Sequence, residues 1–137
     1  MSQNPIAAVN PRWRIAEILR ERVAIDETAA VLDCLGVRQE WMMRWPYEVS
    51  GGELQRIVIA RALLANPKYL VADEITVSLD PVSQDEVWRT LQRYCRARRM
   101  GVLVISHRAA LLDKLCDRIV ELRPDGNGIS HINGGQV

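Results

Sequence analysis

The sequence predicts an α/β fold in which helices come first and a mainly parallel sheet with flanking helices follows. Apolar residues before position 49 recur at helical spacing. After position 65, short apolar runs end in polar residues and alternate with helical segments. This order is typical of a parallel sheet, because each parallel connection has to cross back over the sheet.

Residues 1–11 predict a loop, since prolines interrupt them. Residues 12–22 predict a first helix, and residues 26–35 predict a second that Asp26 caps and Gly36 ends in the left-handed conformation. A third short helical stretch precedes Pro46. The apolar residues on which these three helix predictions rest are Trp13, Ile15, Ile18, Leu19, Val23, Ala29, Ala30, Leu32, Leu35, Trp41 and Met42.

A longer helix is predicted from Ser50 to about Ala65. Ser50 with Glu53 three residues later forms a capping-box pattern, in which each side chain bonds the other residue's backbone N–H. The helix is apolar on most faces, which predicts burial. Asn66-Pro67 ends it.

Residues 69–72 and 101–106 read as strands buried on both faces, as in a parallel sheet. Between them, Asp80-Pro81 opens a helix, with Asp as cap and Pro in the first turn. A helix at 109–115 and a strand at 118–122 follow. A turn at 124–128 predicts that residues 129–132 return as a hairpin partner.

Composition excludes several classes of function. The 137 residues carry a net charge of +1, so no whole-chain field attracts nucleic acid. We interpret the basic run Arg93–Arg99 as a solvated helix end, with a nucleic-acid contact as the alternative. Three separated cysteines indicate neither disulfides nor a zinc site. No apolar run is long enough to span a membrane, and no signal-peptide pattern follows Met1.

Three groups of residues could carry chemistry. Asp73 and Glu74 end a buried strand, where carboxylates need a compensating ligand such as Mg²⁺ or a water. Ser50-Gly51-Gly52 begins a helix, whose free N–H groups attract anions such as phosphate. His107 follows the second strand and could contact a phosphate oxygen. Each pattern alone is more often structural.

Their order and spacing resemble the ATP-binding cassette (ABC) family, over nearly the whole chain. Ser50–Arg56 is similar to the family's signature motif, Tyr69–Glu74 to its Walker B strand, and Ser78-Leu79-Asp80 to its D-loop. His107 resembles the switch histidine and Gln3 the Q-loop glutamine. The pattern Gln-Asn-Pro…Asn-Pro-Arg most resembles the ATPases of peptide and nickel importers.

The resemblance implies a P-loop-NTPase-type fold and a composite ATP site. Asp73 and Gln3 would serve Mg²⁺, with Glu74, His107 and Gln3 catalytic. ATP would lie between two ATPase subunits arranged head to tail. The residues that contact ATP would be Ser50, Gly51, Gly52, Glu53 and Asp80. Residues 1–11 would be the Q-loop region, 12–48 a helical subdomain contacting membrane permease subunits, and 49–137 the C-terminal half of the ATPase core.

The sequence departs from the family in one large respect. It contains no G-x-x-x-x-G-K-[ST] phosphate loop, so we expect a fragment without the N-terminal half of the domain and inactive alone. Uncovered apolar surface predicts self-association. Arg108 stands where the family usually has Asp. We expect a cytoplasmic location, at the inner face of the membrane through the permease.

Two alternatives stay open. A naturally shortened chain could be a non-catalytic interaction module of an ABC system. A DNA-repair-type ABC ATPase would also use Ser-Gly-Gly-Glu, but only 47 positions separate Gln3 from Ser50, without the sustained heptads of that branch's coiled coils.

Overall fold

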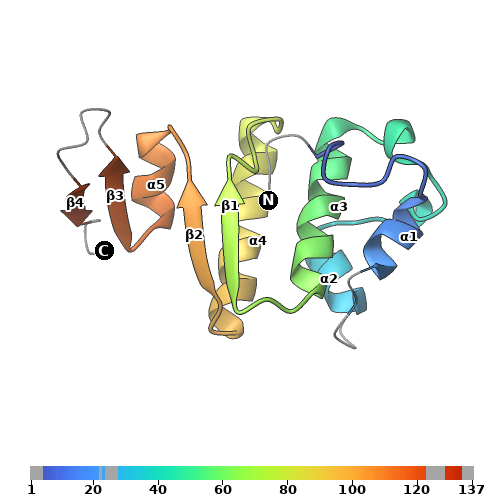
Figure 1. The fold of residues 1–137 in the computed structure, drawn as a ribbon, viewed down its shortest axis with the longest axis horizontal. Helices are drawn as coiled ribbons and strands as arrows, with labels where there is room; N and C mark the ends of the chain where they lie inside the picture. The colour runs from blue at the N-terminus through green and yellow to red at the C-terminus, as the bar shows by residue number, and fades with distance from the viewer. Residues whose placement is uncertain (1–4, 22, 24–27, 123–128, 134–137) are drawn as a thin grey trace.

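The computed structural model describes residues 5–21, 23, 28–122 and 129–133. Helical elements come first, then strands alternating with helices, as predicted (Figure 1). The elements in order are α1 (Ile15–Arg20), α2 (Thr28–Cys34), the 3₁₀ helices η1 (Gln39–Trp41) and η2 (Pro46–Glu48), α3 (Gly51–Leu64), β1 (Tyr69–Asp73), α4 (Pro81–Ala97), β2 (Gly101–Ile105), α5 (Ala109–Leu115), β3 (Arg118–Leu122) and β4 (Ile129–Asn133).

Helices α1 and α2 pack against α3 through part of the predicted apolar set. Ile15, Ile18 and Leu19 of α1 are buried, and so are Val31 and Leu35 at α2. Gly36 has a φ of 64°, as expected for a left-handed residue after a helix. The predicted cap Asp26 lies outside the described residues.

Two apolar residues assigned to the first helix lie outside it and are exposed. Trp13 is 36% exposed and Val23 44%. The reason is the length of the helix, because α1 covers only Ile15–Arg20 and both residues lie beyond its ends. The short helical stretch before Pro46 is the 3₁₀ helix η1, which buries Trp41.

Helix α3 is the centre of the core. Ser50 caps it with the predicted capping box: Glu53 N–H donates to Ser50 Oγ at 3.2 Å, and Ser50 N–H donates to Glu53 Oε2 at 2.7 Å. Helix α3 ends at Leu64, one residue before the predicted end. Its apolar residues are buried on most of its circumference, namely Leu54, Ile57, Val58, Ile59, Ala60, Leu63 and Leu64.

The strands form two pairs rather than one sheet within the described residues. Strands β1 and β2 are parallel, with Tyr69 opposite Gly101 and Asp73 opposite Ile105. Strands β3 and β4 form the predicted antiparallel pair. The expected α/β fold with a parallel sheet is confirmed, although its parallel part consists of β1 and β2 among the described residues. A cavity of about 420 Å³ is lined by α4, α5, β2 and β3.

Only one face of the parallel pair is covered. Helix α4 lies behind β1 (Figure 1), where Leu70 and Ala72 join the core with Val87 and Leu91 of α4. The prediction that both strands are buried on both faces is therefore wrong. The uncovered residues of the other face are Tyr69 (79% exposed), Val71 (45%), Leu103 (59%) and Ile105 (47%).

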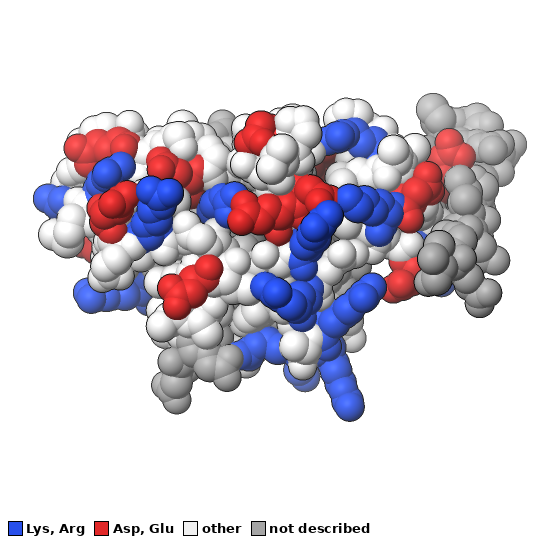
Figure 2. Space-filling model, turned by 180° about the vertical axis from the view of Figure 1, so that it is seen from behind, with Lys and Arg blue, Asp and Glu red and all other residues white. Residues whose placement is uncertain are grey.

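The basic run falls at the end of α4, and three of its arginines, Arg93, Arg96 and Arg99, are exposed. Figure 2 shows the face opposite to that of Figure 1, on which acidic and basic side chains are interspersed over most of the surface. Several basic side chains gather at its lower edge. The arrangement agrees with the interpretation of a solvated helix end.

Candidate functional site

The first part of the site is the turn that follows β1. Glu74 has a φ of 50°, in the left-handed region that few residues other than glycine adopt. Its N–H still donates to the Ile105 carbonyl of β2 at 3.0 Å, so the pairing of the two strands extends to this turn. Left-handed backbone at such a residue persists only where its surroundings hold it, and it is a feature of many functional sites.

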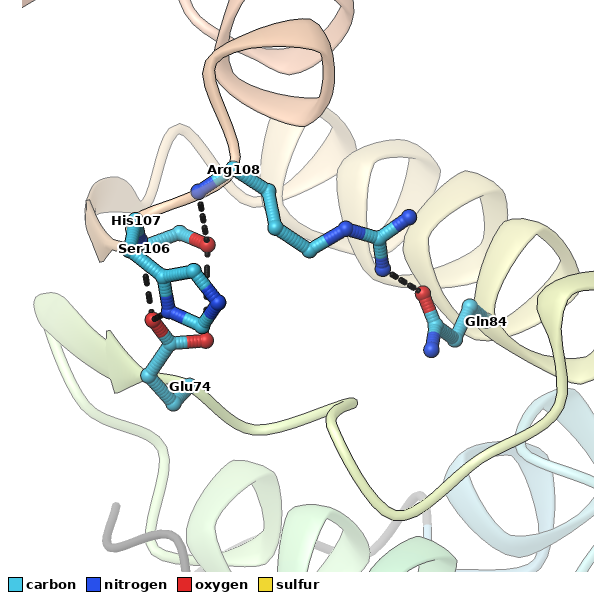
Figure 3. A network of polar contacts seen from close by, with 5 residues as sticks. All are labelled: Glu74, Gln84, Ser106, His107 and Arg108. Carbon is cyan, nitrogen blue, oxygen red and sulfur yellow. Dashed lines mark hydrogen bonds and ion pairs between the residues drawn. The ribbon is translucent and has the colours of Figure 1, made fainter.

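The Glu74 carboxylate bonds the segment that follows β2 (Figure 3). Glu74 Oε1 accepts from the His107 backbone N–H at 2.9 Å and lies 2.5 Å from His107 Nδ1. Glu74 Oε2 accepts from Ser106 Oγ at 3.4 Å. The Glu74 side chain is only 8% exposed, whereas that of His107 is 75% exposed. The structure therefore joins two predicted site residues that are 33 positions apart in the chain.

The charge state of Glu74 follows from these contacts. Burial by itself raises the pKa of Glu74, but the hydrogen bonds from the His107 backbone and ring, the charge of that ring and the Ser106 hydroxyl outweigh it. The net result is a pKa of Glu74 below its ordinary value of 4.5. At neutral pH the group is a carboxylate that can accept a proton or orient a water, with an exposed imidazole beside it.

Asp73 is the last residue of β1 and is half-buried. Among the described residues no three His, Cys, Asp or Glu side chains form a metal-binding group. Mg²⁺ nevertheless fits this edge of the sheet, since it typically takes one or two carboxylates and completes its shell with water and substrate phosphates. Asp73 supplies such a carboxylate.

The second part of the site is the tip of α3. Gly51 is exposed, and a Cβ built on it would meet no atom within 4 Å. The first-turn N–H groups of a helix have no acceptor within the helix, so those of Gly51 and Gly52 are of the kind that can bind an anion. Glu53 does not face outward in the same way, since its carboxylate bonds the Ser50 N–H.

The segment Thr76–Asp80 connects the two parts. A Cβ on Gly52 would lie 3.0 Å from Leu79 Cδ2, so the α3 tip and this segment are in close contact. Thr76 Oγ1 accepts from the buried Trp88 indole at 3.0 Å. Asp80 caps α4, and its Oδ1 accepts from the Val82 and Ser83 N–H groups. The Ser83 hydroxyl first, and then these N–H groups, lower the pKa of Asp80. One carboxylate oxygen of Asp80 is thus occupied within the chain.

Some of the predicted site residues lie together in the structure, and one lies outside the described residues. Glu74 and His107 are in contact, and the Ser50–Gly52 tip approaches Leu79. Gln3 is outside the described residues. Sequence reasoning places Ser106 beside His107 at the strand end but does not predict its bond to Glu74. It also misses Gln84 and the Trp88–Thr76 bond. Nothing in the sequence marks Gln84.

A parallel strand pair with acidic and histidine side chains at its carboxyl edge is an arrangement of α/β proteins, whose open sheets bind ligands at that edge. The model of the ABC transporter family matches residues 1–77. The chain belongs to the ABC transporter family. A dimeric structure of MJ0796, a bacterial ABC transporter cassette, shares the fold with a TM-score of 0.77 at 23% identity, covering 94% of this chain and 60% of that one.

Relatives of known assignment come from the predicted branch. The nickel import ATP-binding protein NikE of Pseudomonas putida is 37% identical over 130 residues, which are 88% of this chain and 48% of NikE. The probable D,D-dipeptide transport ATP-binding protein DdpD of Escherichia coli is 37% identical over 129 residues, 85% of this chain and 39% of DdpD. The resemblance to peptide and nickel importers is confirmed. The chain spans about half the length of these relatives or less.

None of the helices in the described part of the chain combines the length and the apolarity needed to cross a bilayer.

Proposed function

We propose that the chain supplies the C-terminal half of an ATP-hydrolysing site in an importer of the peptide or nickel type. The observation that carries the proposal is Glu74, an ionised carboxylate at the carboxyl edge of the parallel strands, bonded by His107 and Ser106 from the neighbouring strand end. The family and the relatives of the chain support the same assignment, since NikE and DdpD are ATP-binding proteins of transport systems.

In this proposal Glu74 acts as the general base. Its carboxylate orients the attacking water and accepts its proton, while His107, exposed beside it, donates a hydrogen bond to the γ-phosphate. Asp73 and Gln3 would hold Mg²⁺, which would neutralise charge on the phosphate oxygens when bound.

The α3 tip binds the γ-phosphate of an ATP molecule on the nucleotide-binding surface of a partner subunit. Ser50, Gly51 and Gly52 offer N–H groups and the positive end of the helix to a γ-phosphate held mainly by a partner ATPase subunit. Glu53 supports them by fixing Ser50, and Asp80 faces the partner. The occurrence of dimeric structures among proteins of this fold supports a head-to-tail pair.

The remaining partners follow from the type of transporter. Residues 12–48 contact membrane permease subunits, which places the protein at the cytoplasmic face of the membrane. No contact with nucleic acid is part of the proposal. The uncovered face of β1 and β2 packs against the half of the ATPase domain that carries the phosphate loop.

The test is made in an ATPase subunit that joins this chain to a phosphate-loop half. Glu74→Gln is expected to abolish ATP turnover, at least a hundredfold by the usual contribution of a general base, and to leave ATP binding intact. Asp113→Asn, an exposed carboxylate of α5, is the matched control and retains turnover. Normal turnover by the Glu74→Gln protein would remove Glu74 from the role of base.

The chain of 137 residues by itself is expected to show no Mg-dependent ATP hydrolysis above background, since it contains no phosphate loop. Hydrolysis by purified chain would contradict the composite site. If the joined subunit binds permease but never hydrolyses ATP, the chain is an interaction module instead.

A further inference from the structure

One contact beside the site is not explained by the proposed chemistry. Arg108 lies in the turn after β2, and its side chain extends to the first turns of α4, where Arg108 Nη1 donates to Gln84 Oε1 (Figure 3). Gln84 is 9% exposed. Its Nε2 donates to the Leu79 carbonyl at 2.8 Å. Gln84 therefore bonds the turn after β2 on one side and the Thr76–Asp80 segment on the other.

The chemistry of the amide decides which group can stand at position 108. The Leu79 carbonyl only accepts hydrogen bonds, so Gln84 has to turn its NH₂ group toward it. Gln84 Oε1 then faces Arg108 and needs a donor there. Leaving the buried Gln84 Oε1 without a hydrogen-bond donor would cost more free energy than a surface contact contributes. Arg108 differs in this respect from an arginine that bonds only to solvent. The aspartate usual in the family at this position would place a second acceptor against Oε1.

Both ends of the contact reach the site. The Arg108 N–H donates to Ser106 Oγ at 3.2 Å, and the same hydroxyl donates to Glu74 Oε2 at 3.4 Å. At the other end, the Leu79 side chain lies against Gly52 at the α3 tip. A continuous series of bonds and contacts thus runs from Glu74 through Ser106, Arg108, Gln84 and Leu79 to the helix tip.

We infer that Arg108 is a positioning residue, which couples the placement of the Glu74–His107 pair to the Thr76–Asp80 segment through Gln84. It touches neither nucleotide nor water in the proposed mechanism. A role of Arg108 in ATP hydrolysis rests on the proposed function. In that function Arg108 would keep Glu74 and the α3 tip correctly placed relative to each other. The coupling itself is a property of the folded chain.

The experiment is hydrogen–deuterium exchange of the 137-residue chain without nucleotide, followed by mass spectrometry of peptides covering residues 74–80 and 104–108. Arg108→Met removes the donors and keeps an apolar stem. It is expected to speed exchange in both peptides about two- to tenfold, the effect of one hydrogen bond on local opening. Arg108→Lys keeps a charged donor and is expected to recover at least half of that effect.

Two further variants complete the design. Arg89→Met removes another exposed arginine, which pairs with Asp85 on α4, and is expected to leave both peptides unchanged. Gln84→Met breaks the contact from the other side and is expected to loosen the same two peptides, including 104–108, to which Gln84 does not belong.

The inference is overturned if Arg108→Met leaves residues 74–80 at the wild-type rate, if Arg108→Lys behaves like Arg108→Met, or if Arg89→Met has the same effect. Since no nucleotide is present, these outcomes do not depend on ATP hydrolysis. An inactive joined subunit would contradict the proposed function and leave the inferred coupling intact. Wild-type exchange in the Arg108→Met chain would contradict the coupling and leave the proposed function intact.

Discussion

At the scale of single residues, the site depends on one backbone conformation and the bonds that hold it. Glu74 adopts a φ of 50° and is bonded by the His107 N–H, the His107 ring and the Ser106 hydroxyl. These bonds favour the carboxylate over the carboxylic acid. They make the ionisation of Glu74 a contribution to folding as well as a requirement of the proposed chemistry.

A pH dependence of stability follows with a definite sign. The pKa of Glu74 is lower in the folded chain than its ordinary value of 4.5, so its ionised form stabilises the fold. That contribution is complete above about pH 4.5 and is lost as the pH falls through the lowered folded-state pKa. We expect Glu74→Gln to lower the urea midpoint at pH 7 and the difference from wild type to shrink at lower pH.

The measurement is a series of urea unfolding curves from pH 7 downward. Glu40→Gln, which removes an exposed carboxylate of η1, corrects for the loss of one negative charge. A Glu74→Gln deficit that stays constant, or grows, as the pH falls would show that the bonds to Glu74 do not favour its ionised form.

At the scale of the secondary-structure elements, α3 connects the helical region to the sheet and begins at the tip for which we propose phosphate binding. Its capping box satisfies the N–H groups of Ser50 and Glu53, while Gly51 stays open to solvent. The same local motif thus stabilises the helix and leaves anion-binding groups at its tip.

Ser50→Ala is expected to lower the free energy of unfolding by about 1 kcal/mol, the usual cost of losing a serine cap. Urea unfolding followed by far-UV circular dichroism measures it. The control is Ser78→Ala, which removes an exposed serine hydroxyl from the Thr76–Asp80 segment. Equal stability of the Ser50→Ala and wild-type chains would mean that the capping box contributes nothing to the fold.

At the scale of the whole molecule, the apolar residues on one face of the parallel strand pair are exposed in the described structure. Tyr69 and Val71 on β1 and Leu103 and Ile105 on β2 share that face, because residues opposite one another in a strand pair point the same way. An exposed apolar patch of this kind drives association.

We expect the 137-residue chain to self-associate through this face. Leu103→Lys introduces a charge at its centre and is expected to shift the population toward monomer in sedimentation velocity experiments. Val82→Lys changes another exposed valine, at the start of α4, and is expected to leave association unchanged. A wild-type chain that remains monomeric at high concentration would exclude this association.

Sequence alone predicted the local elements well. The cap at Ser50, the turn at Gly36, the start of α4 at Asp80-Pro81 and the pairing of β3 with β4 all depend on neighbouring residues, whose preferences act over a few positions. The first helix is shorter than predicted and excludes Trp13 and Val23, because periodicity does not mark where a short helix begins and ends.

The sequence by itself determined the candidate groups, namely the acidic pair at 73–74, the histidine at 107 and the glycines at 51–52. Only the tertiary structure decided that Glu74 bonds His107 and Ser106, that Gln84 joins Arg108 to Leu79, and that one sheet face stays uncovered. Spacing along the chain limits which residues share a turn or a strand end. Contacts between residues far apart in sequence depend on how whole elements pack, and that packing is set by the buried surfaces of all of them together.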